Sequence, residues 1–328
     1  MRSLRIPALA AATLALLATA ACGSDSGSGG GDDAGSGGSA SGDLQQVAVG
    51  VIPIVDVAPI YLGKEKGFFE DEGIDLTLES GQGGAAIVPG VMSGQFQFGF
   101  SNVTSLMLAR DQGLPLKIVA PGNSSTGEEP DFSAVVVKGD SPIKSAKDLA
   151  GKTVAVNTLK NIGDTTVRES IRKDGGNPED VKFVELAFPD MPAAVANGRV
   201  DAAWVVEPFV AISKSQGDRV VAWNLVDTAP DLMIAGYFTS EQTAQEDPEL
   251  VQSFTDAITT SLEYADSHPD EVRDIVQTYT EIDDKLIADV TLPKWPTEVN
   301  RESTQKLADL ALQDGLVQQP VDVDALLP

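Results

Sequence analysis

Residues 56–99 read DVAPIYLGKEKGFFEDEGIDLTLESGQGGAAIVPGVMSGQFQFG, and the order of patterns in this stretch decides the fold. The segment 58–66 predicts a short helix, because Gly67 follows it where a left-handed C-cap glycine is favoured. Apolar and polar residues alternate over 74–79, which predicts a strand. The glycine-rich turn Gly81–Gly84 comes directly after this strand and opens another helix.

Two further strands flank this stretch. Valines alternate with small or polar residues over 47–51, and phenylalanines alternate over 96–100. Strand, helix, strand, helix and strand in this order predict a doubly wound α/β fold. Such folds bind ligands at the carboxyl edge of the sheet, where helix N-termini favour an anion or a polar acceptor.

The same stretch resembles the opening of the SsuA-like solute-binding proteins of ABC importers for nitrate, sulfonates, taurine and thiamine pyrimidine precursors. The likeness lies in the KGFF helix, the acidic EGI run, the glycine-rich turn and a final strand with Gln97 where aspartate is usual. The resemblance covers almost everything after the N-terminal tail. It implies a two-lobed periplasmic-binding-protein-like fold of type II, with two crossovers between lobes and a helical C-terminal third.

Composition excludes several functional classes. The 328 residues hold 49 acids and 23 bases, so the net charge of −26 argues against nucleic acid or an anionic membrane as a partner. One cysteine excludes an internal disulfide. One histidine, His268, excludes a histidine-based catalytic pair or a zinc site.

Residues 1–21 predict a secretory signal, because Arg2 and Arg5 precede an apolar run that ends in small residues. Cys22 follows directly and resembles the lipidated cysteine of bacterial lipoproteins. Thr19 departs from that pattern, in which leucine is usual three residues before the cysteine. A free cysteine within an ordinary signal peptide is the alternative. A lipoprotein is expected to be extracytoplasmic and anchored to the bacterial cell membrane.

The expected domain boundaries follow from changes in composition and from turn-forming residues along the chain. Residues 22–43 are nearly all Gly, Ser, Ala and Asp, which predicts a flexible tether. Lobe 1 is expected to take residues 44–138 plus 236–328, and lobe 2 residues 139–235. The resemblance places the start of the second lobe at DLAGKTVAV, residues 148–156.

The two lobes are expected to be joined by two linkers. These are predicted near Val137–Ser141 and Ile234–Tyr237, and they should let the lobes close on a ligand. In lobe 1 a strand is predicted over 118–120 and a turn over 121–123. The C-terminal helices are expected to buttress the first lobe.

The glycine-rich turn is a candidate ligand contact. No Gly-Lys-Ser/Thr follows it, so it is not a Walker loop, and Ala86 breaks the G-x-G-x-x-G pattern. A tight strand-to-helix turn is the alternative reading. Four asparagines also follow predicted strands, where each can instead be a cap or a turn residue.

Two acidic residues have a double interpretation. Glu207 precedes a proline at a helix N-terminus, where it can stabilise the helix dipole, but the resemblance places it on the cleft wall. Asp56 can cap the first helix or accept a hydrogen bond from a ligand. The expected ligand-binding set is Asp56, Gln82, Gly83, Gly84, Asn102, Asn123, Asn157, Asn161, Gly163, Trp204 and Glu207.

The sequence therefore predicts a binding protein rather than an enzyme, with no cofactor, no metal and no catalytic residues. Its expected partners are a small-molecule solute and an ABC permease, and the protein is expected to be a monomer. An enzyme of the same fold in pyrimidine-cofactor synthesis is disfavoured, because the cysteine-rich segment and the histidines of such enzymes are absent. A ligand sensor for a membrane receptor is the other alternative.

The charge of the expected site favours a particular kind of solute. Asp56 and Glu207 bring negative charge, whereas Lys160 is the one basic residue among the expected contact turns. A bare anion would meet repulsion of roughly 1–4 kcal/mol at contact distance. We therefore expect a solute with a cationic or hydrogen-bond-donating group, such as an aminosulfonate or an aminopyrimidine.

Overall fold

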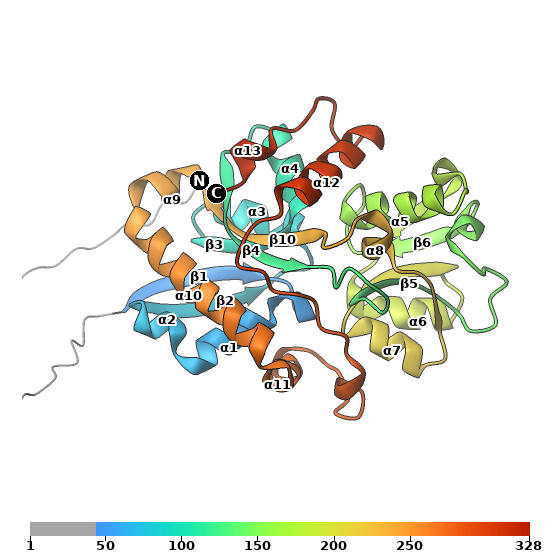
Figure 1. The fold of residues 1–328 in the computed structure, drawn as a ribbon, viewed down its shortest axis with the longest axis horizontal. Helices are drawn as coiled ribbons and strands as arrows, with labels where there is room; N and C mark the ends of the chain where they lie inside the picture. Colours follow the sequence, from blue (N-terminus) through green and yellow to red (C-terminus); the bar gives the residue numbers. More distant parts are fainter. Residues whose placement is uncertain (1–43) are drawn as a thin grey trace, which may run out of the picture. The chain divides into compact units, whose positions relative to one another are not determined.

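The computed structural model describes residues 44–328. The predicted signal peptide, the predicted tether and the predicted lipidation site at Cys22 lie outside these residues. The described chain forms two five-stranded sheets with helices packed against them (Figure 1). None of its helices is both long enough and apolar enough to cross a membrane.

The first sheet has the strand order β2-β1-β3-β10-β4. Its strands are β1 (Gln45–Val51), β2 (Ile74–Ser80), β3 (Phe98–Asn102), β4 (Leu116–Ser124) and β10 (Met233–Ser240). β1 runs parallel to β2 and β3, whereas β10 runs antiparallel to β3 and β4. The parallel half is the predicted doubly wound start of the chain.

The second sheet has the order β7-β6-β8-β5-β9. Its strands are β5 (Ser133–Val137), β6 (Thr153–Val156), β7 (Lys182–Glu185), β8 (Ala202–Val206) and β9 (Arg219–Ala222). β6 runs parallel to β7 and β8, and β5 runs antiparallel to β8 and β9. Both sheets therefore combine a parallel half with an antiparallel half.

We define lobe 1 as the first sheet with its helices, and lobe 2 as the second sheet with its own. The helices of lobe 1 are α1 (Ala58–Lys66), α2 (Phe68–Asp71), α3 (Gly84–Met92), α4 (Val103–Asp111), α9 (Glu241–Glu246), α10 (Pro248–Ser267), α11 (Pro269–Tyr279), α12 (Arg301–Gln313) and α13 (Val323–Leu326). Those of lobe 2 are α5 (Ile162–Lys173), α6 (Met191–Ala196), α7 (Phe209–Ser215) and α8 (Asn224–Thr228).

The first helix forms as its sequence predicts. Pro59 stands in the first turn, where a missing N–H costs no hydrogen bond. Gly67 ends the helix in the left-handed region at φ 84°. The C-terminal helices buttress lobe 1 as expected, because Phe254 of α10 stacks on Phe98 of β3 with ring centroids 3.9 Å apart.

The crossings between the lobes differ from the prediction. The chain leaves the first sheet through residues 125–132 and returns through 229–232. The linkers predicted near 137–141 and 234–237, and the lobe boundaries that followed from them, are therefore wrong. Val137 pairs with β8 and β9 in the second sheet. The buried run of β5 lies in the interior of that sheet. The turn-forming residues after it mark the end of a strand rather than a change of lobe.

The predicted turn at 121–123 is also wrong, because β4 continues to Ser124. Its register against β10 shifts at several points, as happens at β-bulges. A Cβ on Gly122 would lie 2.7 Å from the ring of Phe100 and 3.0 Å from the carbonyl oxygen of Ala235. This glycine lets neighbouring strands approach closely instead of turning the chain.

Candidate functional site

The two lobes meet at the ends of their strands, and several predicted residues lie at this contact. Asn161 Nδ2 donates a hydrogen bond to Ser105 Oγ at 2.9 Å, and Asn157 Nδ2 donates to the carbonyl oxygen of Gln82 at 3.4 Å. Gly83 also faces lobe 2, because a Cβ there would lie 2.9 Å from Thr158 Oγ1. The glycine-rich turn of lobe 1 therefore lies directly against the turn after β6.

The two capping asparagines have structural roles as well. Asn102 Oδ1 accepts a hydrogen bond from the backbone N–H of Ser105 and caps α4. Asn161 Oδ1 accepts one from the backbone N–H of Ile162 at the start of α5. The capping role of both asparagines is thus confirmed, and the side chain of Asn161 also contacts the other lobe.

Two predicted glycines permit close packing beside the contact. A Cβ on Gly84 would lie 1.8 Å from Ser101 Oγ, and one on Gly163 would lie 2.4 Å from Trp204 Cε3. Trp204 is 3% exposed, and its indole N–H donates to Ser133 Oγ at 2.8 Å. The ring of Trp204 therefore belongs to the core of lobe 2, and its N–H is already paired within the protein.

Asp56 lies in a short 3-10 turn (η1, Val55–Val57) and does not cap α1, whose N-cap is Val57. Its carboxyl group is buried, with Oδ1 accepting a hydrogen bond from Asn123 Nδ2 at 2.9 Å. Burial raises the pKa of Asp56 from 3.8 to about 7, and the bond from Asn123 opposes this rise. A carboxyl group so placed can change its protonation state when a donor or a cation arrives.

Three polar atoms around Asp56 are buried without a hydrogen-bond partner in the described structure. They are Asp56 Oδ2, Asn123 Oδ1 and the hydroxyl of Tyr237. The charge of Asp56 contributes, after burial, to raising the pKa of Tyr237, so the two groups are near neighbours. Buried polar atoms are normally paired, which makes this cluster a candidate for contact with a ligand or water.

Glu207, unlike Asp56, has both carboxyl oxygens hydrogen-bonded within the protein. Its Oε2 accepts a hydrogen bond from the backbone N–H of Ala211 at 3.0 Å, and its Oε1 accepts one from Thr291 at 3.1 Å. Its own carbonyl oxygen accepts from the N–H of Val55. Burial raises the pKa of Glu207 to about 7, and its two backbone hydrogen bonds oppose this. The carboxylate therefore caps the start of α7 and ties lobe 2 to a loop that packs on lobe 1.

Two cavities lie between the lobes. The first, of about 230 Å³, is mostly apolar. Lobe 1 contributes Ile52, Pro53, Ile54, Ser80, Gly81 and Gln82, and lobe 2 contributes Ala187, Phe188, Pro189 and Phe209. The second, of about 360 Å³, includes Ser105, Lys160 and Asn161. Residues of the predicted ligand-binding set thus line both cavities. Asp56 is two residues beyond Ile54, which lines the first cavity.

Several residues at this site carry no signal in the sequence. Tyr237 lies within an apolar strand, and Phe188 and Phe209 look like ordinary core residues. In the structure Phe188 packs edge to face on Trp204, and its ring is stacked 6.1 Å from that of Phe209. Among residues 44–328 no group of three His, Cys, Asp or Glu side chains is arranged to hold a metal ion.

Comparison with known proteins places this geometry in context. The family model described as NMT1/THI5 like matches residues 54–272. The riboflavin-binding protein RibY of Chloroflexus aurantiacus is 27% identical over 310 residues, covering 87% of this chain and 85% of that protein. The formylaminopyrimidine-binding protein of Halalkalibacterium halodurans is 24% identical over 224 residues, covering 67% of this chain and 65% of that protein.

A solved structure shows the same fold. The alkanesulfonate-binding protein SsuA of Xanthomonas axonopodis pv. citri, bound to MOPS, has a TM-score of 0.73 at 16% identity. The match covers 88% of this chain and 99% of that chain. The predicted two-lobed periplasmic-binding-protein fold is therefore confirmed.

Proposed function

The chain belongs to the NMT1/THI5-like family, and from this premise we propose that it is the substrate-binding lipoprotein of an ABC importer. It captures a small polar organic solute between its lobes and delivers it to the permease as a monomer. The observation that carries the proposal is the pair of inter-lobe cavities, because each is lined by residues of both lobes. Rotation about the two crossing segments would open and close them.

The lining of the site supports an organic solute. The first cavity has two phenylalanines and two prolines, and among residues 44–328 no lysine, arginine or histidine lines it. Asp56 follows Ile54 of this cavity by two residues in the chain. Its Oδ2 has no hydrogen-bond partner among the described residues and can accept a hydrogen bond from a solute. We propose a solute with an apolar or flat body and a donor group that meets Asp56, such as an aminopyrimidine. An aminosulfonate is second, with Lys160 in the neighbouring cavity as a counter-charge.

The names of the relatives are consistent with an organic solute, and they do not single out one of the candidate compounds. They name riboflavin, formylaminopyrimidine and an alkanesulfonate as ligands of those proteins. Each of these compounds is organic, and two contain heterocyclic rings with hydrogen-bonding groups. The two relatives described above are named for binding rather than for a reaction, which favours transport over the enzyme alternative.

Thermal unfolding with added compounds tests this function. Riboflavin, an aminopyrimidine, taurine, nitrate and sulfate should be added separately to the purified protein. An organic compound with a donor group is expected to raise the melting temperature, since a ligand at about 100 times its Kd stabilises the folded state by about 2.7 kcal/mol. Stabilisation by nitrate or sulfate, with no response to the organic compounds, would contradict the proposal.

The anchor is a separate part of the proposal and falls on residues outside those described. Cys22→Ser should release the protein from the membrane fraction, because lipid chains at this position would supply the attachment. Cell fractionation followed by immunoblotting measures the distribution, with Ser24→Ala as the matched control that keeps the cysteine. Membrane association that persists in Cys22→Ser would rule out the lipoprotein assignment.

A further inference from the structure

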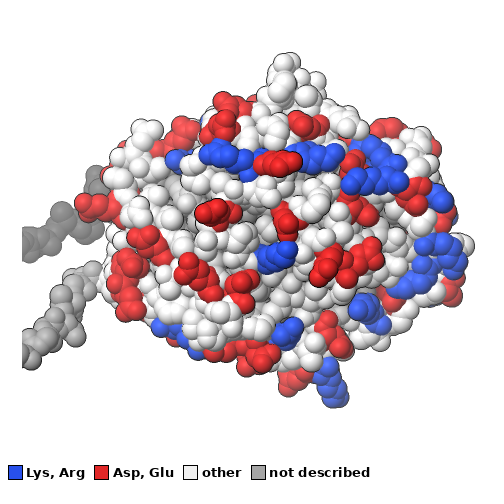
Figure 2. Space-filling model, viewed as in Figure 1, with Lys and Arg blue, Asp and Glu red and all other residues white. Residues whose placement is uncertain are grey.

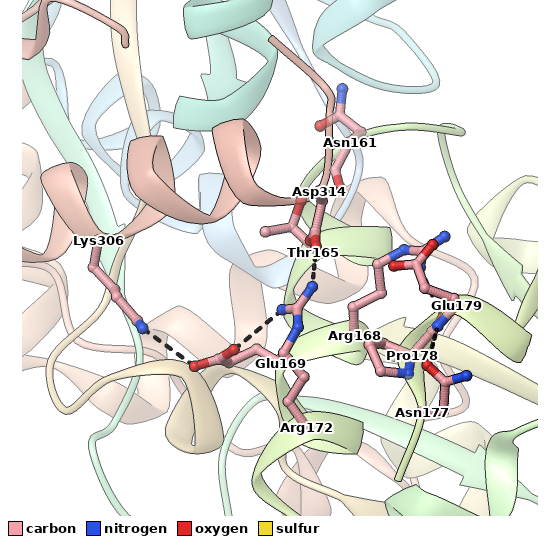
Figure 3. Close-up of polar contacts among 10 residues, drawn as sticks. All are labelled: Asn161, Thr165, Arg168, Glu169, Arg172, Asn177, Pro178, Glu179, Lys306 and Asp314. Atoms are coloured by element: carbon pink, nitrogen blue, oxygen red, sulfur yellow. Dashed lines mark hydrogen bonds and ion pairs between the residues drawn. The ribbon is translucent and has the colours of Figure 1, made fainter. Parts of the chain in front are cut away.

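Four charged side chains, two from lobe 1 and two from lobe 2, form a continuous series of contacts across the boundary between the lobes (Figure 3). Lys306 Nζ of α12 contacts Glu169 Oε1 of α5 at 3.2 Å, and Glu169 Oε2 contacts Arg172 Nη1 at 3.2 Å. Arg172 Nη2 in turn pairs with Asp314, the C-cap of α12. We refer to the Lys306–Glu169 and Arg172–Asp314 contacts as the inter-lobe ion pairs.

The two helices are attached to different lobes. α12 is fixed to lobe 1, because Ser303 Oγ accepts a hydrogen bond from the backbone N–H of Met233 in β10. α5 is fixed to lobe 2, because Thr166 Oγ1 accepts one from Asn224 Nδ2 in α8. Each helix is thus attached to its own lobe, and the inter-lobe ion pairs connect the two lobes.

Burial sets these contacts apart from ordinary surface pairs. The side chain of Asp314 is 1% exposed, that of Glu169 9% and that of Arg172 20%. By contrast, Arg301 and Asp324 form a pair in which the side chains are 50% and 86% exposed. Opening the lobes would expose these partly buried charges to water, where dissolved ions screen them, so added salt favours the open state. Figure 2 shows basic and acidic side chains gathered together over α12 and α5.

We propose that the inter-lobe ion pairs stabilise the closed arrangement of the lobes and so slow the release of a bound solute. The inference rests on the proposed closure of the lobes around a solute. Opening would separate two positive and two negative groups and expose them to water. The closed state should therefore weaken as ionic strength rises, while the neutral contact between Asn161 and Ser105 should not respond.

Spin labels on the two lobes can measure this without any solute. Lys64 of α1 and Arg199 of lobe 2 are exposed and suit replacement by cysteine, in a Cys22→Ser background that removes the chain's one native cysteine. Distance distributions should be recorded at about 20 mM and about 1 M NaCl, where the Debye length falls from roughly 20 Å to 3 Å. The ratio of closed to open molecules is expected to fall at least about fivefold at high salt.

Matched variants identify the contacts responsible. Lys306→Gln and Arg172→Gln should shift the solute-free protein toward the open arrangement at low salt and reduce its salt response. Arg168→Gln is the control, because Arg168 lies one turn earlier on α5 and pairs with Glu179 inside lobe 2. It should leave the distance distribution unchanged. Lys306 is 40% exposed at its side chain, so Lys306→Gln tests the proposal even if Arg172→Gln does not fold.

The outcomes separate this inference from the proposed function. Lobes that respond to a solute, but not to salt or to Lys306→Gln, would overturn the inference and leave the binding function standing. An equal shift in Arg168→Gln and Lys306→Gln would also overturn it, since the effect would not depend on contact between lobes. A single lobe separation under all conditions, with and without solute, would contradict both.

Discussion

Raising the pH from about 5 to about 8 is expected to lower the free energy of unfolding of the solute-free protein by about 2–5 kcal/mol. The main cause is burial of two carboxyl groups, and burial adds a smaller contribution by raising the pKa of Asp164 and that of Asp218 to about 6. Burial raises the pKa of Asp56 from 3.8 and that of Glu207 from 4.5, each to about 7. Asp131 adds to the effect at Asp56, and Asp289 adds to it at Glu207, while the backbone donors of both groups oppose it.

The sign follows from proton binding. Between the unfolded and folded pKa values, from about pH 4 to about pH 7, the folded protein keeps protons that the unfolded chain releases. Stability therefore falls as the pH rises through this window and levels off above about pH 7. Repulsion within the net charge of −26 acts in the same direction, so variants are needed to isolate the two groups.

Chemical denaturation at a series of pH values measures the effect. The double variant Asp56→Asn with Glu207→Gln is expected to lose most of the pH dependence. Asp190→Asn is the control, because Asp190 is an exposed aspartate without a side-chain capping bond and should keep the wild-type slope. A wild-type stability that rises between pH 5 and pH 8, or a double variant that matches the wild type, would contradict the assigned burial effect.

Asp56→Asn is expected to weaken solute binding at least about tenfold, the loss of a charge-assisted hydrogen bond. The carboxyl group offers Oδ2, which has no partner among the described residues, while Oδ1 is held by Asn123. Asparagine keeps the size of the side chain but presents an amide NH₂ group at one of these positions. A donor group on the solute would then face another donor.

Titration calorimetry of the wild type and the variant with the stabilising compound measures this loss. Asp190→Asn again serves as the control and should bind like the wild type. Glu207→Gln should change affinity less than Asp56→Asn, because both oxygens of Glu207 are engaged by backbone N–H groups. Equal binding by Asp56→Asn and the wild type would remove Asp56 from the solute contacts.

Much of the fold could be predicted from the sequence, because the local pattern of many segments matches the element that packing stabilises. The helix 58–66, its C-cap at Gly67 and the N-cap at Asn102 are confirmed, since each depends on residues close in the chain. The family resemblance is confirmed as well. The crossings were misplaced because β5 reads as a buried strand in either lobe, and only its pairing with β8 decides between them.

The site was harder to predict, because its side chains meet through long-range contacts. The role of Glu207 depends on Thr291, which lies 84 residues away. Tyr237 joins the surroundings of Asp56 through strand pairing between β10 and β4, which no local pattern reveals. The inter-lobe ion pairs likewise join residues 137 and 142 positions apart.

Mass spectrometry of the small molecules released from protein purified without denaturant tests the central claim most directly. Wild type, Asp190→Asn and Asp56→Asn should be prepared in parallel and their released compounds quantified against protein. We expect one organic compound with a hydrogen-bond donor, near one molecule per chain in the wild type and in Asp190→Asn, and strongly depleted in Asp56→Asn. An inorganic anion in equal amounts in all three proteins, or no retained compound in any of them, would contradict the account.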